Sequence, residues 1–234
     1  MSAFLAQRLP EPLPDEPLAL ARTWFTEASQ RRDQPNPNAM VLATVAANGH
    51  PSSRVVLCKD IVLTGGYLLL YTNYQSRKGS EIAANPRGAA LFHWDHLHRQ
   101  VRIEGRLVRS PPAESDAYFQ SRAWQSRVGA WASEQSRPVA SHEALIEQLR
   151  AAGRRFATPP VGPDASDGAE EAREVPVPRP PHWGGYRLWA DAVELWVEGA
   201  YRIHDRARWV RELSGAGDGY SFAASPWRVE RLQP

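Results

Sequence analysis

Two adjacent cations stand where an expected strand runs into an expected helix. They are Arg77 and Lys78, at the end of the segment YTNYQSRK that begins at Tyr71. Backbone N–H groups at a helix N-terminus attract anions, and two full charges strengthen that attraction. Because cations are unfavourable at this end of the helix dipole, a bound anion would explain their placement. Two solvated surface cations would explain this segment equally well.

A second pair of cations brackets the apolar segment RVVLCK, which runs from Arg54 to Lys59. In a regular strand, side chains five positions apart point to opposite faces. We therefore expect Arg54 and Lys59 to contact different ligands, or different parts of one ligand, unless each pairs with a nearby acid. Cys58 lies within this expected strand without a neighbouring histidine, so we expect it to be a buried packing residue.

A third cluster, YRIHDR at residues 201–206, follows Trp196. If this segment is a strand, Arg202 and His204 lie two positions apart on one face. Both side chains could then contact one anionic ligand that carries a ring. An exposed strand rim would give the same pattern of residues.

Neither a metal ion nor a nucleic acid is predicted as a ligand. The histidines of HWDHLH, residues 93–98, do not have the spacing of a zinc motif, and the chain's one cysteine is no part of this cluster. Residues 95–98 are instead expected to form a hairpin turn. The 26 acidic residues are interleaved with 28 basic ones and the formal net charge is +2, which does not indicate a nucleic-acid-binding surface.

The elements that position these clusters are mostly strands. Apolar alternation and the turn signals Asn48-Gly49 and Gly65-Gly66 predict strands at 39–46, 52–59, 67–72, 87–94, 99–109, 185–190, 192–198 and 226–232. Capping signals and helical periodicity predict helices from Pro17 to Arg32, over 77–84 after Ser76, from Ser110 to about Arg122, and from Ser141 to about Ala157. We predict a mainly β fold with peripheral helices (α+β), built as a small antiparallel barrel with helices packed outside.

Length and composition indicate the domain organisation. At about 150 residues per domain, 234 residues suit one domain with extensions. We expect an N-terminal extension with one helix over residues 1–35, a main domain over 36–234, and a disordered loop over the Pro-, Gly- and acid-rich segment 158–174. No apolar stretch reaches 18 residues and the N-terminus does not read as a signal peptide, so we expect a soluble, cytoplasmic protein.

Taken in order, motifs from about Asn36 to Pro234 resemble those of pyridoxine (pyridoxamine) 5′-phosphate oxidases. The motifs are NPNAMVLATV, RVVLCK, YTNYQSRKGSEIAANPR, HRQVRIEG, YFQSRAWQSRVGAWASEQS, PRPPHWGGYRL, ELW, RIHDR and WRVERLQP. Lys59 and Lys78, the two lysines of the chain, both lie within them. The resemblance implies a split β-barrel of the FMN-binding type that forms a homodimer. Asn36 departs from the family pattern, in which an acid often occupies this position.

The resemblance also implies FMN as the cofactor and identifies residues that bind it. Arg54, Arg77 and Lys78 would hold the FMN phosphate, together with Gln135 and Ser136 from the other subunit. The residues implied for the remainder of the flavin are Val55, Val56, Leu57, Cys58, Lys59, Tyr71, Thr72, Gln100, Trp196 and Arg206.

The reaction implied by the resemblance is the oxidation of pyridoxamine or pyridoxine 5′-phosphate by O2. The products would be pyridoxal 5′-phosphate, hydrogen peroxide and, from the amine, ammonia. The positions that hold the substrate phosphate match Lys59, Tyr118, Arg122 and Ser126. Arg202 and His204, with Ile203 between them, match the positions over the pyridine ring and are the candidate catalytic residues.

Two other functions stay open. A paralogous FMN oxidase of the phenazine-biosynthesis type would act on a larger ring without a phosphate, and such a substrate does not require the second set of phosphate-binding residues. A non-catalytic flavin-binding protein would not require Arg202 and His204. The preference between pyridoxine and pyridoxamine phosphates is not predicted.

Overall fold

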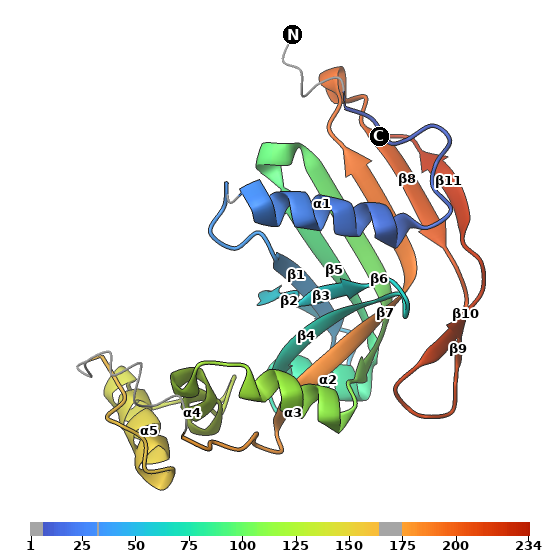
Figure 1. Ribbon diagram of the computed structural model, residues 1–234. Coiled ribbons are helices and arrows are strands. Elements are labelled where there is room, and N and C mark those ends of the chain that lie inside the picture. Colours follow the sequence, from blue (N-terminus) through green and yellow to red (C-terminus); the bar gives the residue numbers. More distant parts are fainter. Residues whose placement is uncertain (1–6, 32, 164–174) are drawn as a thin grey trace. The chain divides into compact units, whose positions relative to one another are not determined.

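The computed structural model describes residues 7–31, 33–163 and 175–234 (Figure 1). The chain divides into two compact units. The first, which we call the sheet unit, comprises the chain up to Leu70, Glu81–Arg109 and Tyr186–Pro234. The second, which we call the helical unit, comprises Tyr71–Ser80 and Ser110–Gly185. The predicted division into residues 1–35 and 36–234 stays a prediction.

Antiparallel strands dominate the fold, in the order β11-β8-β7-β6-β5-β1-β2, with β4 pairing to β3 and to β7. The strands of this sheet are β1 (Ala39–Val45), β2 (Pro51–Leu57), β3 (Asp60–Val62), β4 (Tyr67–Asn73), β5 (Arg87–Trp94), β6 (Arg99–Arg109), β7 (Trp183–Val197), β8 (Asp205–Val210) and β11 (Arg228–Leu232). A second, two-stranded sheet pairs β9 (Leu213–Gly215) with β10 (Phe222–Ala224). The predicted fold class, mainly β with peripheral helices, is confirmed.

The helices are α1 (Pro17–Arg31), α2 (Arg77–Ala84), α3 (Pro112–Gln120), α4 (Trp124–Ala132) and α5 (His142–Arg155), and there is a 3₁₀ turn at Asp95–Leu97. The sequence does not predict α4, because Ala123 precedes it and no side chain caps its first turn. Helices α1, α2 and α5 begin where their signals indicate, whereas α3 begins at Pro112, after Pro111 and without a side-chain cap from Ser110. The predicted end of α1 at Arg32 lies outside the described residues. No helix in the described part of the chain is long and apolar enough to cross a membrane.

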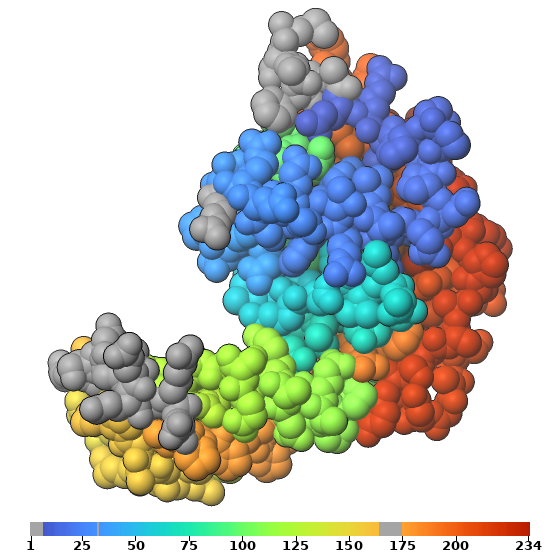
Figure 2. Space-filling view, in the orientation of Figure 1, coloured from blue at the N-terminus to red at the C-terminus, as the bar shows by residue number. Residues whose placement is uncertain are grey.

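Local sequence explains the core of the sheet unit. Gly49 has a φ of +84° and its N–H donates to the Ala46 carbonyl at 2.9 Å, which closes the predicted turn between β1 and β2. Helix α1 lies across one face of the sheet unit (Figures 1 and 2). Its Phe25 ring meets the rings of Phe92 and Trp94 edge-on, at centroid distances of 5.9 and 6.5 Å. The apolar face of α1 is thereby fixed to the sheet.

One strand replaces two that the sequence predicts. The predicted break near Ala190 is a β-bulge inside β7, where Glu104 pairs with Ala192, Gly105 pairs with Ala190, and Asp191 is left out of register. Gly105 makes this close approach feasible, since a Cβ there would lie 1.8 Å from the Trp189 carbonyl oxygen. The bulge keeps β7 continuous over 15 residues.

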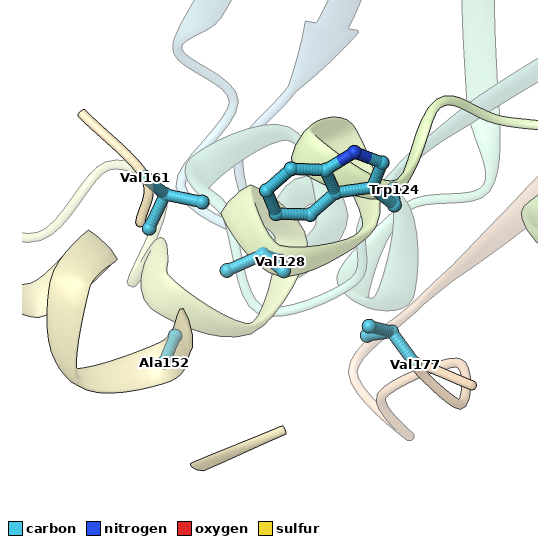
Figure 3. Close-up of a cluster of buried hydrophobic side chains, with 5 residues drawn as sticks. All are labelled: Trp124, Val128, Ala152, Val161 and Val177. Atoms are coloured by element: carbon cyan, nitrogen blue, oxygen red, sulfur yellow. The ribbon is translucent and has the colours of Figure 1, made fainter. Parts of the chain in front are cut away.

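The helical unit has its own apolar cluster, formed by the five residues in Figure 3, Trp124, Val128, Ala152, Val161 and Val177. Val161 belongs to the segment 158–174 that we predicted to be a disordered loop. It is buried against α4 and α5, so the prediction is wrong for this part of the segment. Residues 164–174 lie outside the described residues.

Candidate functional site

Lys78 lies in the first turn of α2, where the strand-to-helix motif predicts a cation, and it is buried. Lys78 is 8% exposed, and its ammonium group donates hydrogen bonds to Gln135 Oε1 at 2.7 Å, Thr72 Oγ1 at 3.1 Å and Ser76 Oγ at 3.2 Å. These three acceptors are neutral oxygens. A lysine is rarely buried, and a positive charge held in this way at a helix N-terminus suits a phosphate.

The N-cap of α2 fixes the position of Ser76 Oγ, one of the three acceptors of the Lys78 ammonium group. Ser76 Oγ donates to the Asn73 carbonyl at 2.7 Å and accepts from the Gly79 N–H at 3.3 Å. Gly79 is required here, because a Cβ would lie 2.1 Å from the Tyr74 carbonyl oxygen. Arg77, the other predicted cation, is exposed on the first turn.

Gln135 lies beside Lys78 of its own chain. Thr72 Oγ1 donates to Gln135 Oε1 at 3.2 Å, and Asn73 Nδ2 donates to the Ser133 carbonyl at 3.2 Å. The segment after α4 is therefore tied to the end of β4 within the helical unit. The prediction that Gln135 reaches this site from the other subunit is thus corrected, and the exposed Ser136 follows in the same segment.

Arg54 belongs to a polar network inside the sheet unit that includes an acid we did not predict. Its guanidinium donates to Glu81 Oε2 at 3.1 Å, and also to the Thr44 and Ser52 hydroxyls. Both hydroxyls in turn donate to the same oxygen of Glu81, which is 5% exposed. Arg54 therefore pairs with an acid, which is the alternative we had left open for it. Glu81 was detectable as an acid within the helix 77–84 that carries the predicted cations.

Lys59 does not share a strand with Arg54. Strand β2 ends at Leu57, and the Cys58 N–H donates to Asn38 while the Lys59 N–H donates to Leu69. The argument from opposite strand faces therefore does not apply to the exposed Lys59. Cys58 is fully buried as predicted, and burial raises the pKa of its thiol to about 12.

Three residues predicted to contact the flavin lie side by side on one face of the sheet unit. Gln100 of β6 pairs with Trp196 of β7, which pairs with Arg206 of β8. The buried Glu194 fixes Arg206, whose Nη2 and Nε lie 2.8 and 3.1 Å from Glu194 Oε1. Glu194 also forms an ion pair with Arg102 at 2.7 Å. Sequence reasoning missed Glu194, although it is the first residue of the motif ELW.

The chain reverses direction between β7 and β8. Tyr201 and Arg202 have φ values of +56° and +64°, and the Ile203 N–H donates to the Ala200 carbonyl at 3.0 Å. Positive φ at both central residues is the signature of a type I′ hairpin turn. Because β8 begins only at Asp205, the prediction that Arg202 and His204 share a strand face is wrong.

The turn gives these two candidate catalytic residues different surroundings. His204 packs on Trp196, with ring centroids 4.6 Å apart, and its Nδ1 accepts the Gly199 N–H at 3.2 Å. Arg202 is exposed, as is the neighbouring Ile203. His204 is thus positioned against the face that carries Trp196, and Arg202 projects from the hairpin tip.

One of the predicted substrate-phosphate residues, Tyr118, belongs to a stack of aromatic rings in the helical unit. Tyr118 of α3 stacks on Tyr71 at a centroid distance of 3.8 Å and an interplanar angle of 11°. Arg122 follows α3, and its Cζ lies over the Trp183 ring, 4.6 Å from the centroid. Burial lowers the pKa of Arg122. Ser126 is exposed in the first turn of α4.

One nitrogen of Arg122 is buried beside these rings. Within the described ranges, Arg122 Nη1 is buried and has no hydrogen-bond partner. A buried charged donor without an acceptor is costly, so an anionic ligand is the group that fits here. For metals, no three His, Cys, Asp or Glu side chains of the described residues are grouped to hold an ion.

Two sequence models of known protein families match most of the chain. A sequence model described as pyridoxamine 5′-phosphate oxidase matches residues 27–152. A second one, described as the pyridoxine 5′-phosphate oxidase C-terminal dimerisation region, matches residues 183–234.

Among solved structures, PhzG from Burkholderia lata 383, in complex with tetrahydrophenazine-1-carboxylic acid, is similar with a TM-score of 0.79. It is 27% identical in sequence, and the match covers 99% of this chain and 100% of that one. The split β-barrel that the sequence resemblance implied is confirmed by this match.

Curated relatives show closer sequence similarity. The pyridoxine/pyridoxamine 5′-phosphate oxidase of Paracoccus denitrificans is 44% identical over 229 residues, covering 94% of this chain and 96% of the relative. The protein of the same name from Burkholderia cenocepacia is 42% identical over 219 residues, covering 94% and 89%. With both sequence models also matching, the chain belongs to the pyridoxamine 5′-phosphate oxidase family.

Proposed function

We propose that this protein oxidises pyridoxamine 5′-phosphate or pyridoxine 5′-phosphate to pyridoxal 5′-phosphate. Oxygen is the oxidant and is reduced to hydrogen peroxide, and the amine substrate also releases ammonia. The observation that carries the proposal is Arg122, whose buried Nη1 lacks a hydrogen-bond partner within the described ranges and which lies next to the stacked Tyr118 and Trp183. This arrangement suits a substrate that combines a phosphate with a flat ring.

Family membership supports FMN as the cofactor. FMN, when bound, supplies the acceptor for the two electrons of the oxidation. The buried ammonium of Lys78 and the N-terminus of α2 would hold its phosphate. Arg54, oriented by Glu81, is the predicted partner from the sheet unit. Lys78 and the N-terminus of α2 can hold one terminal phosphate, and the sequence has no dinucleotide-binding Gly-rich motif, which favours FMN over FAD.

Residues of the sheet unit would orient the rings. Gln100, Trp196 and Arg206 offer one continuous face to the flavin. Because His204 Nδ1 accepts a backbone N–H, a neutral His204 carries its proton on Nε2 and donates from that edge. Arg202 would supply a permanent positive charge over the substrate ring. Alignment of this kind accounts for about 7–11 kcal/mol of barrier lowering in well-oriented reactions.

The match to a C-terminal dimerisation region supports a homodimer. It covers residues 183–234, which include Trp196, His204 and Arg206. Two of the predicted flavin-binding residues of the sheet unit, Trp196 and Arg206, therefore lie in the region that matches the dimerisation model.

A second candidate activity is the oxidation of a larger ring without a phosphate. It is favoured by the structural similarity to PhzG, whose solved complex contains tetrahydrophenazine-1-carboxylic acid. The Arg122 guanidinium can donate hydrogen bonds to a carboxylate as well as to a phosphate. A comparison of turnover with both kinds of ligand is therefore needed to distinguish the two activities. A non-catalytic flavin-binding protein is the third candidate, and it predicts no turnover with either ligand.

Steady-state assays separate the three candidates. The purified yellow protein is mixed in air with pyridoxamine 5′-phosphate, pyridoxine 5′-phosphate or tetrahydrophenazine-1-carboxylic acid. We expect pyridoxal 5′-phosphate and hydrogen peroxide in a one-to-one ratio from the first two ligands. Turnover of the phenazine alone would identify the paralogue, and no turnover at all would identify a flavin-binding protein. Mass analysis of the acid-released chromophore should give FMN.

A further inference from the structure

Trp183, for which we predicted no role, lies at the centre of the aromatic group in the helical unit. It begins β7 and is 8% exposed. Its ring is nearly parallel to those of Tyr71 and Tyr118, at centroid distances of 5.6 and 6.2 Å, and Phe119 meets it edge-on at 5.0 Å. The side chain is therefore held in one orientation from several directions.

The backbone after Trp183 is adapted to this packing. A Cβ on Gly184 would lie 2.1 Å from Tyr74 Oη. A Cβ on Gly185 would lie 2.5 Å from Ser110 Oγ and 3.0 Å from the Tyr71 ring. The two glycines thus let β7 pass directly beside the tyrosines. The sequence WGG therefore contributes to the packing of the aromatic rings as well as to the start of the strand.

The ring face of Trp183 holds the guanidinium of Arg122. The Arg122 Cζ lies 4.6 Å from the Trp183 centroid and 5.5 Å from the Phe119 centroid. Cation–π contact of this kind stabilises a partly desolvated arginine without using its hydrogen-bond donors. Nη1, which has no acceptor in the described part of the chain, stays available to an anion.

We propose that Trp183 is a positioning residue for the substrate phosphate, acting through Arg122. It fixes the plane of the guanidinium and leaves the Nη1 donor for a phosphate oxygen. The proposal rests on the function given above and adds to it a residue that determines selectivity for phosphorylated over non-phosphorylated substrates.

The test compares Trp183→Leu, Trp183→Phe and wild-type holoenzyme with pyridoxamine 5′-phosphate and with pyridoxamine, which has no phosphate. Trp183→Leu should raise KM for the phosphorylated substrate about ten-fold while kcat changes less than two-fold, as expected for lost uniform binding. The kcat/KM for pyridoxamine should change less than two-fold. Trp183→Phe keeps a ring face and should recover most of the KM. Equal losses for both substrates would overturn the proposal.

Two controls separate positioning from folding. Trp24→Leu removes another buried tryptophan that has an arginine, Arg99, over its ring at 4.9 Å, and it should leave both KM values unchanged. In an Arg122→Ala background, Trp183→Leu should change kcat/KM for pyridoxamine 5′-phosphate less than two-fold, because the group it positions is gone. A full ten-fold loss in that background would contradict the mechanism.

A binding measurement distinguishes failure of this inference from failure of the proposed function. Calorimetry with pyridoxal 5′-phosphate and with pyridoxal needs no turnover. If the wild type binds the phosphorylated ligand but oxidises nothing, the proposed function fails, and a ten-fold weaker Kd in Trp183→Leu still supports the inference. If Trp183→Leu binds both ligands as the wild type does, the inference fails whatever the activity.

Discussion

Arg54 shows how a buried acid can prepare a cation for a ligand. The Glu81 carboxylate accepts from Thr44, Ser52 and Arg54 at one oxygen, so the protein itself orients the guanidinium. Removing one partner of a buried charge pair leaves the other without compensation, and this is costly. Glu194 has the same relation to Arg206 in the sheet unit.

Glu81→Gln should therefore destabilise the protein. The substitution keeps the size of the side chain but removes the charge that Arg54 faces, and we expect the free energy of unfolding to fall by about 2 kcal/mol. Urea unfolding measures this change. Glu147→Gln is the matched control, because Glu147 pairs with Arg154 in a solvent-exposed ion pair, and it should leave the transition unmoved. Equal transitions for both variants would contradict the role of the network.

The buried thiol of Cys58 should make the free energy of unfolding depend on pH in the alkaline range. Its pKa is raised from near 9 to about 12 by burial, so the thiol is neutral in both the folded and the unfolded chain below about pH 8. Above that pH the unfolded chain loses the proton first, and stability falls as pH rises toward 12, by up to about 1.4 kcal/mol per pH unit. Cys58→Ala should show a shallower loss between pH 8 and 10 in urea unfolding. Parallel losses in the two proteins would contradict this assignment.

Residue patterns and the family resemblance pointed to candidate cations but not to the groups that hold them. Lys78, Arg54 and Arg206 were identified, whereas Glu81, Glu194 and Trp183 were not. A charged residue is conspicuous in a sequence, but its partner across a sheet or between separate segments depends on tertiary packing. The residues that pair with these cations could therefore be identified only from the structure.

At the scale of elements, strong local signals predicted structure well. Ser76 caps α2 and strand β6 alternates as expected, because capping and period-two burial are local properties. Helix α4 has no capping side chain, and β7 carries a bulge, so neither could be delimited from local signals. Tyrosine and arginine rarely adopt positive φ, so the turn at Tyr201-Arg202 lacks the Asn-Gly or Gly-containing signal by which such a hairpin is predicted.

That turn gives a prediction about stability. Tyr201 is 95% exposed and has a φ of +56°, so its side chain contributes little packing while its backbone is strained. Asparagine tolerates this conformation better, and Tyr201→Asn should raise the free energy of unfolding by about 0.5 kcal/mol. Tyr201→Ala retains the strain and serves as the control without a gain. A Tyr201→Asn protein no more stable than Tyr201→Ala would contradict the strained turn.

At the scale of the molecule, predicted site residues are distributed over both compact units. Lys78, Tyr118 and Arg122 belong to the helical unit, and Arg54 and Arg206 belong to the sheet unit. Strand β2 forms one end of the strand order and exposes apolar side chains, with Val55 at 65% exposure. Exposed apolar residues on an edge strand favour burial by association.

We therefore expect a homodimer in solution that depends on this edge. Val55→Glu should shift the protein toward monomer and release FMN, because a buried carboxylate would oppose the contact. Light scattering with absorbance detection measures both effects. Val139→Glu, at another exposed apolar position, should stay dimeric and yellow. A Val55→Glu protein that remains a dimer would exclude β2 from the interface.

Anaerobic stopped-flow mixing shows whether the bound flavin accepts electrons from a phosphorylated B6 vitamer. Pyridoxamine 5′-phosphate should bleach the flavin of the wild-type protein in a single turnover, and pyridoxamine should do so far more slowly at the same concentration. Admission of oxygen should restore the yellow colour and give one pyridoxal 5′-phosphate per flavin. Flavin that stays oxidised with pyridoxamine 5′-phosphate, or that bleaches equally fast with pyridoxamine, would contradict the proposed oxidation.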